Sequence, residues 1–106
     1  MAPTRTSLKT EKIPDGLRLM PKEDLVASTV EGLRAAFAKA LEGAKGSVVL
    51  DLAQVQQIDS LGITLVLGLF KSCRNQGLAF RIQGAHADLQ RVFKLFNLTK
   101  FFEVAG

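Results

Sequence analysis

The run "SVVLDL" at residues 47–52 constrains the fold of this chain more than any other stretch of its sequence. Four of its six residues are aliphatic, and they do not have the spacing of a single helical face. Such a run is typical of a strand that is covered on both faces, as strands inside parallel sheets are. We therefore expect residues 47–52 to form the central strand of an α/β domain.

Two shorter strands are predicted before this run. Leu8 and Ile13 indicate an edge strand, and "LRLM" at 17–20 alternates apolar and polar residues like a second strand. Between them, "PDG" at 14–16 is a turn in which Pro fixes φ and Gly supplies conformational freedom. The two strands are therefore expected to form a hairpin.

A first helix is predicted between the hairpin and the central strand. Apolar residues recur at the spacing of one buried helical face, at Val30, Leu33, Phe37 and Leu41. "SxxE" at Ser28–Glu31 has the spacing of a capping box and predicts where the helix begins. Gly43 or Gly46 is expected to end it.

Further elements are predicted after the central strand. A long helix is expected from Ser60 to near Gly77, "LAFRI" at 78–82 alternates like a strand, and "KFFEV" at 100–104 closes the chain as a last strand. A third amphipathic helix is indicated by Leu89, Val92, Phe93 and Phe96.

Strands that alternate with helices at this spacing favour βαβ units with right-handed crossovers. The sequence therefore predicts an α/β fold, with a mixed sheet of four to five strands packed against three to four helices. A chain of 106 residues is the size of one domain, which we expect over residues 7–106. Residues 1–6 show no periodicity, and we expect a flexible terminus there.

Composition argues against several classes of protein. The formal net charge is +4, but the Lys and Arg residues are scattered from Arg5 to Lys100 with no two adjacent, so we expect no nucleic-acid binding. The longest apolar run, "LVLGLF", is far shorter than the roughly 20 residues that span a bilayer, so we expect no membrane insertion. The N-terminus lacks the apolar core of a signal peptide, and we expect a cytoplasmic protein.

The chain also lacks the residue sets that enzymes and metal sites need. Cys73 is the single cysteine, and no Cys/His cluster accompanies it. His86 is the single histidine, and its setting in "GAHADL" favours a structural role at the start of a helix or on the surface. Asp51 and Asp59 could hold a cation, but the helix dipole is the simpler explanation for carboxylates there. We expect no catalytic residues, metal or cofactor.

The segment "IDSLG" at 58–62 places a charge and a hydroxyl between apolar stretches. In a helix that begins at Ser60, an exposed strip is formed by Ser60, Thr64, Gly68, Lys71 and Asn75. The opposite, buried side holds Gly62, Leu65, Val66, Leu69 and Cys73. Leu61 and Leu67 border the strip, and Gly68 allows close approach of another backbone. We interpret the strip as a docking surface.

Two interpretations of Ser60 are open. Ser is a preferred N-cap, and Asp59 could equally be a turn or capping residue. A hydroxyl at a helix N-terminus also lies where a phosphate would meet free N–H groups and the positive end of the dipole. Phosphorylation adds nearly two negative charges, so a partner fitted to the neutral strip would be rejected while the fold survives. The second interpretation makes Ser60 a switch.

Residues 47–104 resemble the STAS domain of bacterial anti-sigma factor antagonists. The resemblance includes the strand that ends in Asp51, the D-S-x-G turn at 59–62, "GLFK" at 68–71, Gly77 and "LQRVFKLFNLTKFF" at 89–102. It implies a single STAS-like domain in which the serine after the aspartate, here Ser60, is phosphorylated by the partner kinase. Unphosphorylated, such a domain binds an anti-sigma factor, itself a serine kinase, and frees the sigma factor. A phosphatase of the PP2C type resets it.

Some positions depart from the family pattern. Leu61 stands where many members have a second small residue, and Asn97 where members often have glycine, although Asn tolerates the left-handed conformation. Asp24 in "MPKEDL" is matched to a family aspartate only with a gap. The expected partner-binding residues are Asp24, Asp59, Leu61, Gly62, Thr64, Leu67, Gly68 and Lys71. The expected state is a monomer or weak dimer.

One alternative uses the same fold differently. STAS-like domains also serve as subunits of membrane transport systems and as scaffold pieces of sensory complexes, where the serine can be purely structural. The retained Ser60 favours the antagonist function.

Overall fold

The computed structural model describes residues 8–106, so the flexible terminus expected at 1–6 lies outside the described residues. In chain order the elements are β1 (Leu8–Ile13), β2 (Gly16–Pro21), α1 (Val30–Ala40), β3 (Ser47–Asp51), α2 (Ser60–Asn75), β4 (Ala79–Gln83), α3 (Ala87–Leu95), the 3-10 turn η1 (Leu98–Lys100) and β5 (Glu103–Val104).

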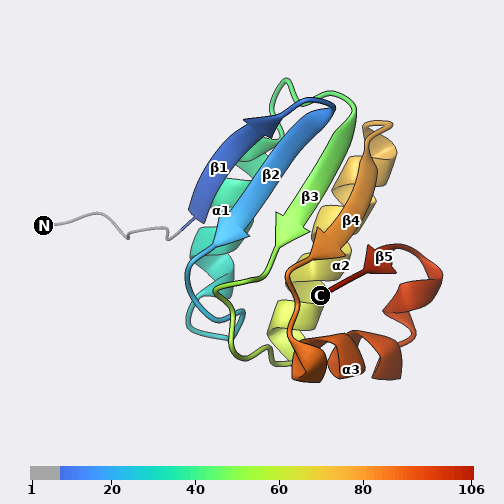
Figure 1. The fold of residues 1–106 in the computed structure, drawn as a ribbon. Coiled ribbons are helices and arrows are strands. Elements are labelled where there is room, and N and C mark those ends of the chain that lie inside the picture. The colour runs from blue at the N-terminus through green and yellow to red at the C-terminus, as the bar shows by residue number, and fades with distance from the viewer. Residues whose placement is uncertain (1–7) are drawn as a thin grey trace, which may run out of the picture.

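Within residues 8–106, five strands form one sheet in the order β1-β2-β3-β4-β5, and three α-helices pack around it. The β1–β2 hairpin is antiparallel and every other pairing is parallel. Helices α1 and α2 lie side by side behind the sheet, and α3 crosses the end where β3 and β4 finish (Figure 1). The predicted mixed α/β sheet, its hairpin and its central strand are confirmed.

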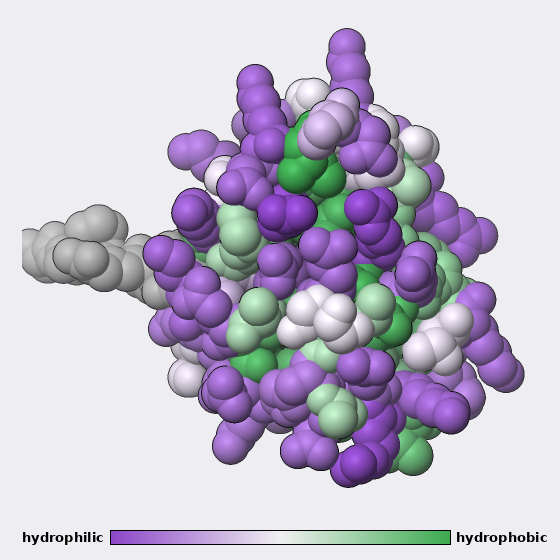
Figure 2. All heavy atoms as spheres, viewed as in Figure 1, coloured by the Kyte–Doolittle hydropathy of each residue, from purple (hydrophilic) through white to green (hydrophobic). Residues whose placement is uncertain are grey.

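The two faces of the central strand are covered differently. Val48 and Leu50 belong to the core beneath the helices. Val49 is also fully buried, but it points to the opposite face, where its cross-strand neighbours are Arg18 and Arg81. Figure 2 shows that this face is mostly hydrophilic. The apolar run at β3 is therefore covered by helices on one side and flanked by long arginine side chains on the other.

Helix α1 buries the predicted apolar face, which consists of Val30, Leu33, Phe37 and Leu41. The predicted capping box is wrong, because Thr29 is the N-cap residue and no side chain caps the helix. The Thr29 hydroxyl lies 2.6 Å from the Asp24 carbonyl oxygen and accepts a hydrogen bond from the Val26 N–H at 3.1 Å. A turn before the helix therefore uses this hydroxyl, and the exposed Ser28 is left outside the helix.

Helix α3 confirms part of its predicted face. Leu89 and Phe93 are buried and Val92 is half-buried, but Phe96 is 53% exposed. Phe96 is the C-cap residue, and Asn97 after it turns the chain with a φ of 61°. Assigning Phe96 to the buried face was wrong because the helical geometry ends before it. The left-handed conformation expected for Asn97 is confirmed.

Candidate functional site

The start of α2 is held by the carboxylate of Asp59. One of its oxygens, Oδ1, accepts a hydrogen bond from the Gly62 N–H, and the other, Oδ2, accepts one from the Ala27 N–H, each at 2.9 Å. The hydrogen bond from Gly62, together with that from Ala27, keeps the pKa of Asp59 below its ordinary value, despite an opposing effect of desolvation. Asp59 is therefore the N-cap of α2, and the interpretation of Ser60 as the cap is wrong.

Ser60 is the first residue of α2, and its side chain is exposed. No group among residues 8–106 hydrogen-bonds its hydroxyl, although its carbonyl oxygen accepts a hydrogen bond from Thr64 Oγ1 at 3.0 Å. Because Asp59 already caps the helix, the Ser60 oxygen is not engaged as its cap. It lies beside the first-turn N–H groups at the positive end of the α2 dipole.

Asp24 positions the loop that leads to Ser60. Its Oδ1 accepts hydrogen bonds from the N–H groups of Gln56 and Gln57 at 2.8 and 3.1 Å. The next residue, Leu25, forms a parallel bridge with Ile58. The segment before α1 is thus joined to the loop before α2. Sequence reasoning missed this role, since no local pattern links residues that are 32 positions apart.

Gly62 does not belong to the exposed surface. It is buried, and a Cβ built there would lie 2.0 Å from the Leu25 carbonyl oxygen. The expectation that Gly62 contacts a partner is therefore corrected: its missing side chain lets α2 approach the segment before α1. This agrees with the helical geometry, which placed Gly62 on the side opposite Ser60.

The other α2 residues expected on the exposed side of the helix lie there. Thr64, Gly68 and Lys71 are exposed along with Ser60. On the two borders, Leu61 is 48% exposed and Leu67 is half-buried against the core. We call the exposed set of Ser60, Leu61, Thr64, Gly68 and Lys71 the α2 strip. Contact of these residues with a partner stays a prediction.

The single histidine has the structural role that its sequence setting favoured. His86 is the N-cap of α3, and its Nδ1 accepts a hydrogen bond from the Asp88 N–H at 3.2 Å. Its Nε2 therefore carries the proton and donates to the Gln56 carbonyl oxygen at 2.9 Å. Both ring nitrogens are engaged, and the ring joins α3 to the loop before α2.

The remaining chemical candidates are also occupied or buried. In the part of the chain that the structure describes, no three metal-ligating side chains come together. Asp51 Oδ1 accepts a hydrogen bond from the Ala53 N–H at 3.0 Å, in a turn just after β3. Cys73 is buried, and desolvation raises the pKa of its thiol to about 11, so it is a poor nucleophile at neutral pH.

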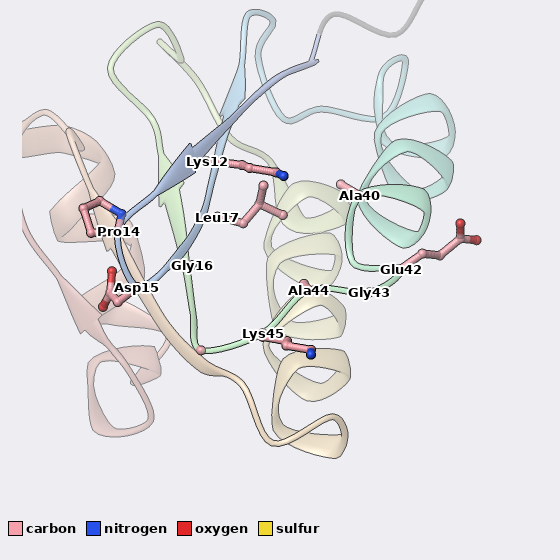
Figure 3. A pocket seen from close by; sticks show the side chains of 11 residues that line it. Lys12, Pro14, Asp15, Gly16, Leu17, Ala40, Glu42, Gly43, Ala44 and Lys45 are labelled. Carbon is pink, nitrogen blue, oxygen red and sulfur yellow. The ribbon is translucent and has the colours of Figure 1, made fainter.

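A hollow of about 490 Å³ lies at the other end of the molecule, between the hairpin turn and the α1–β3 connection. Lys12, Asp15, Glu42 and Lys45 line it, but the charged ends of these side chains lie well apart from one another (Figure 3). The hollow therefore presents no convergent set of polar groups, and the start of α2 remains the candidate site.

A family model described as the STAS domain matches residues 7–105. The chain belongs to the STAS domain family. No helix among residues 8–106 is long and apolar enough to cross a membrane.

Solved structures share the fold of this STAS domain. A candidate anti-sigma factor antagonist of Thermotoga maritima superposes with a TM-score of 0.84 at 22% identity, covering 93% of this chain and 86% of that one. The anti-sigma factor antagonist SpoIIAA in its unphosphorylated form gives 0.75 at 17% identity, covering 93% and 87%. The Bacillus cell fate determinant SpoIIAA in its phosphorylated form gives 0.70 at 19%, covering 93% and 90%.

Two curated relatives are proteins of an intermembrane phospholipid transport system. The intermembrane phospholipid transport system binding protein MlaB of Escherichia coli (strain K12) is 33% identical over 57 residues, which are 54% of this chain and 59% of that protein. MlaB of Shigella flexneri matches equally. The chain thus spans about three fifths of the length of the curated relatives it matches.

Proposed function

We propose that this STAS domain is a protein-binding module of the anti-sigma factor antagonist type, switched by phosphorylation of Ser60. The observation that carries the proposal is the exposed Ser60 hydroxyl, which has no hydrogen-bond partner within residues 8–106 while its neighbour Asp59 caps the helix. In the unphosphorylated state the module binds an anti-sigma factor, and the sigma factor is released.

The switch acts through charge. The Ser60 oxygen attacks the γ-phosphorus of ATP held by the kinase, the bond to ADP breaks, and the hydroxyl proton passes to a base of the kinase. The negative charge of the phosphate is then added to that of the neighbouring Asp59 carboxylate, so the start of α2 becomes strongly negative. The hydrogen bonds that hold the helix belong to Asp59, so the fold is retained while a partner is repelled.

The proposed partners are an anti-sigma factor with serine kinase activity and a PP2C-type phosphatase that restores the hydroxyl. SpoIIAA, which shares the fold, has structures in both an unphosphorylated and a phosphorylated form, which supports this proposal. The domain itself acts by binding, without catalytic residues, metal or cofactor. We place it in the cytoplasm as a monomer or weak dimer that neither binds nucleic acid nor inserts into membranes.

Intact-mass measurement tests the proposal directly. The protein is incubated with ATP and the kinase-like anti-sigma factor of the same genome, and we expect a gain of one phosphate. Ser60→Ala should abolish the gain, whereas Ser72→Ala, an exposed hydroxyl later on α2, should not. Equal labelling of Ser60→Ala and the wild type would assign the modification to another residue.

A second candidate function rests on the 33% identity to MlaB. As a subunit of a transport system, the domain would bind a transporter permease, with Ser60 as part of a constant contact. The two functions are separated by Ser60→Asp, which should weaken capture of the anti-sigma factor. Capture of the permease by wild type and Ser60→Asp alike, with no phosphorylation of the wild type, would favour transport.

A further inference from the structure

An apolar groove lies between α1 and α2, beside the α2 strip. It has a volume of about 210 Å³ and is lined mainly by Phe37, Ala38, Leu41, Leu65, Gly68 and Leu69. Gly68 is exposed, and a Cβ built there would have none of the described atoms within 4 Å. The groove is therefore open where Gly68 lies.

Gly68 has no internal reason to be glycine. It lies inside α2 without a positive φ, and no described group approaches it closely. Glycine at such a position destabilises a helix relative to alanine, because the unfolded chain gains more conformational freedom. The domain therefore keeps the groove open with a residue that weakens its own helix.

The charged side chain that lines the groove is positive. Arg34 lines it from α1, with 57% of its side chain exposed. The acid paired with Arg34 is Glu31, at 3.6 Å, and a loose exposed pair of this kind contributes little to stability. Lys71 adds a second exposed cation on the α2 strip. A partner with negative charge is therefore favoured here.

The groove is continuous with the α2 strip. Thr64 lies one turn after Ser60 and lines the groove, and Gly68 follows one turn later. Eight residues of helix rise about 12 Å, so a partner helix of two to three turns laid along α2 would cover both ends. One partner element can thus contact the groove and sense the phosphate.

We infer that this groove seats an aliphatic side chain of an acidic amphipathic helix in the partner protein. The inference rests on the proposed function and deepens it, since it names the recognition element of the same interface. In helix-in-groove binding of this kind, an apolar side chain is anchored in the groove, and charged residues at the edge of the groove select a partner of opposite charge. Phosphate on Ser60 then repels the acidic helix. In the unphosphorylated state, the space at Gly68 and the positive charge of Arg34 favour its binding.

Calorimetric titration with the purified kinase-like anti-sigma factor tests the inference. Gly68→Leu fills the groove, and we expect it to weaken binding at least tenfold. Ala35→Leu adds an apolar side chain at an exposed position of α1 outside the groove lining, and it should change the affinity less than twofold. Circular dichroism of both variants checks that α2 is retained.

Charge is tested by a second pair of variants. Arg34→Glu should weaken binding at least fivefold, whereas Lys45→Glu, an exposed lysine between α1 and β3, should not. Because Arg34 is exposed, this arm decides the inference even if Gly68→Leu fails to fold. Equal binding of Arg34→Glu and the wild type would rule out an acidic occupant.

The outcomes separate the groove from the switch. If Gly68→Leu binds as well as the wild type while Ser60 is still phosphorylated, the groove inference is overturned and the proposed function stands. If the anti-sigma factor neither binds nor phosphorylates the wild type, the proposed function is wrong, and the groove inference is then wrong as well. Self-association in sedimentation that Gly68→Leu abolishes would assign the groove to a second copy of the chain, against an acidic partner helix.

Discussion

Helices α1 and α2 lie side by side on one face of the sheet, and each begins beside a hydroxyl residue that is used differently. At α1, the Thr29 hydroxyl lies 2.6 Å from one carbonyl oxygen and accepts a hydrogen bond from the Val26 N–H, inside a turn. At α2, Asp59 caps the helix, and the Ser60 hydroxyl is exposed without a partner among the described residues. The Thr29 hydroxyl is therefore engaged in the turn before its helix, whereas the Ser60 hydroxyl is engaged by none of the described residues.

The two starts are also physically joined. Asp59 Oδ2 accepts a hydrogen bond from the Ala27 N–H in the turn before α1, and the Asp59 N–H donates to the Leu25 carbonyl oxygen at 3.1 Å. The turn before α1 thus supports the residue that leaves Ser60 free. Substitutions in either region can test how far this support extends.

The largest effect is expected from Gly62→Ala. The new Cβ would meet the Leu25 carbonyl oxygen at 2.0 Å, so the two helix starts must separate. We expect a loss of about 3 kcal/mol in the free energy of unfolding, the upper range for overpacking. Urea denaturation measures it. A loss below about 0.5 kcal/mol, the size of ordinary surface effects, would mean that the two segments are not held in contact.

Asp59→Asn should have the next largest effect, and it should depend on pH. The folded-state pKa of Asp59 is lowered, so its carboxylate contributes stability that is complete above about pH 5 and is lost as the pH falls through its titration. The difference in urea midpoint between wild type and Asp59→Asn should therefore shrink from pH 6 to pH 3. Asp15→Asn, in the exposed hairpin turn, is the matched control. A constant difference across this range would contradict the role of the Asp59 charge.

Thr29→Ala and Ser60→Ala compare the two hydroxyls directly. Removing the Thr29 hydroxyl should lower the free energy of unfolding by about 1 kcal/mol, because the hydrogen bond with the Val26 N–H is lost. Removing the exposed Ser60 hydroxyl should change it by less than about 0.5 kcal/mol. Thermal melts of the wild type and the two variants measure both changes. A larger loss for Ser60→Ala than for Thr29→Ala would reverse the comparison on which the switch rests.

The smallest effect is expected from Gly68→Ala. This position is open, so alanine should fit and raise the stability by roughly 0.7 kcal/mol through helix propensity alone. It is also the matched control for Gly62→Ala, since both substitutions add one methyl group to α2 on opposite sides. Destabilisation by Gly68→Ala would show that the groove between α1 and α2 is already filled.

Much of the fold could be predicted from the sequence because its signals are local. The hairpin, the central strand and the buried face of α1 all follow from apolar residues spaced within about a dozen positions. The same reasoning separated the exposed Ser60 from the buried Gly62, since 100° per residue divides a helix into faces. The prediction failed at element ends, at Ser28 and Phe96, where the chain leaves helical geometry and the periodicity no longer applies.

The site was only partly predictable. The sequence by itself determined that a hydroxyl would stand at the start of an amphipathic helix with one open side. Only the tertiary structure decided that Asp59 caps this helix, that Gly62 is needed for close packing, and that a groove opens beside Gly68. These features depend on contacts between residues such as Ala27 and Asp59, 32 positions apart. Which distant groups meet is settled by how the helices and loops pack on the sheet, and no local pattern encodes that.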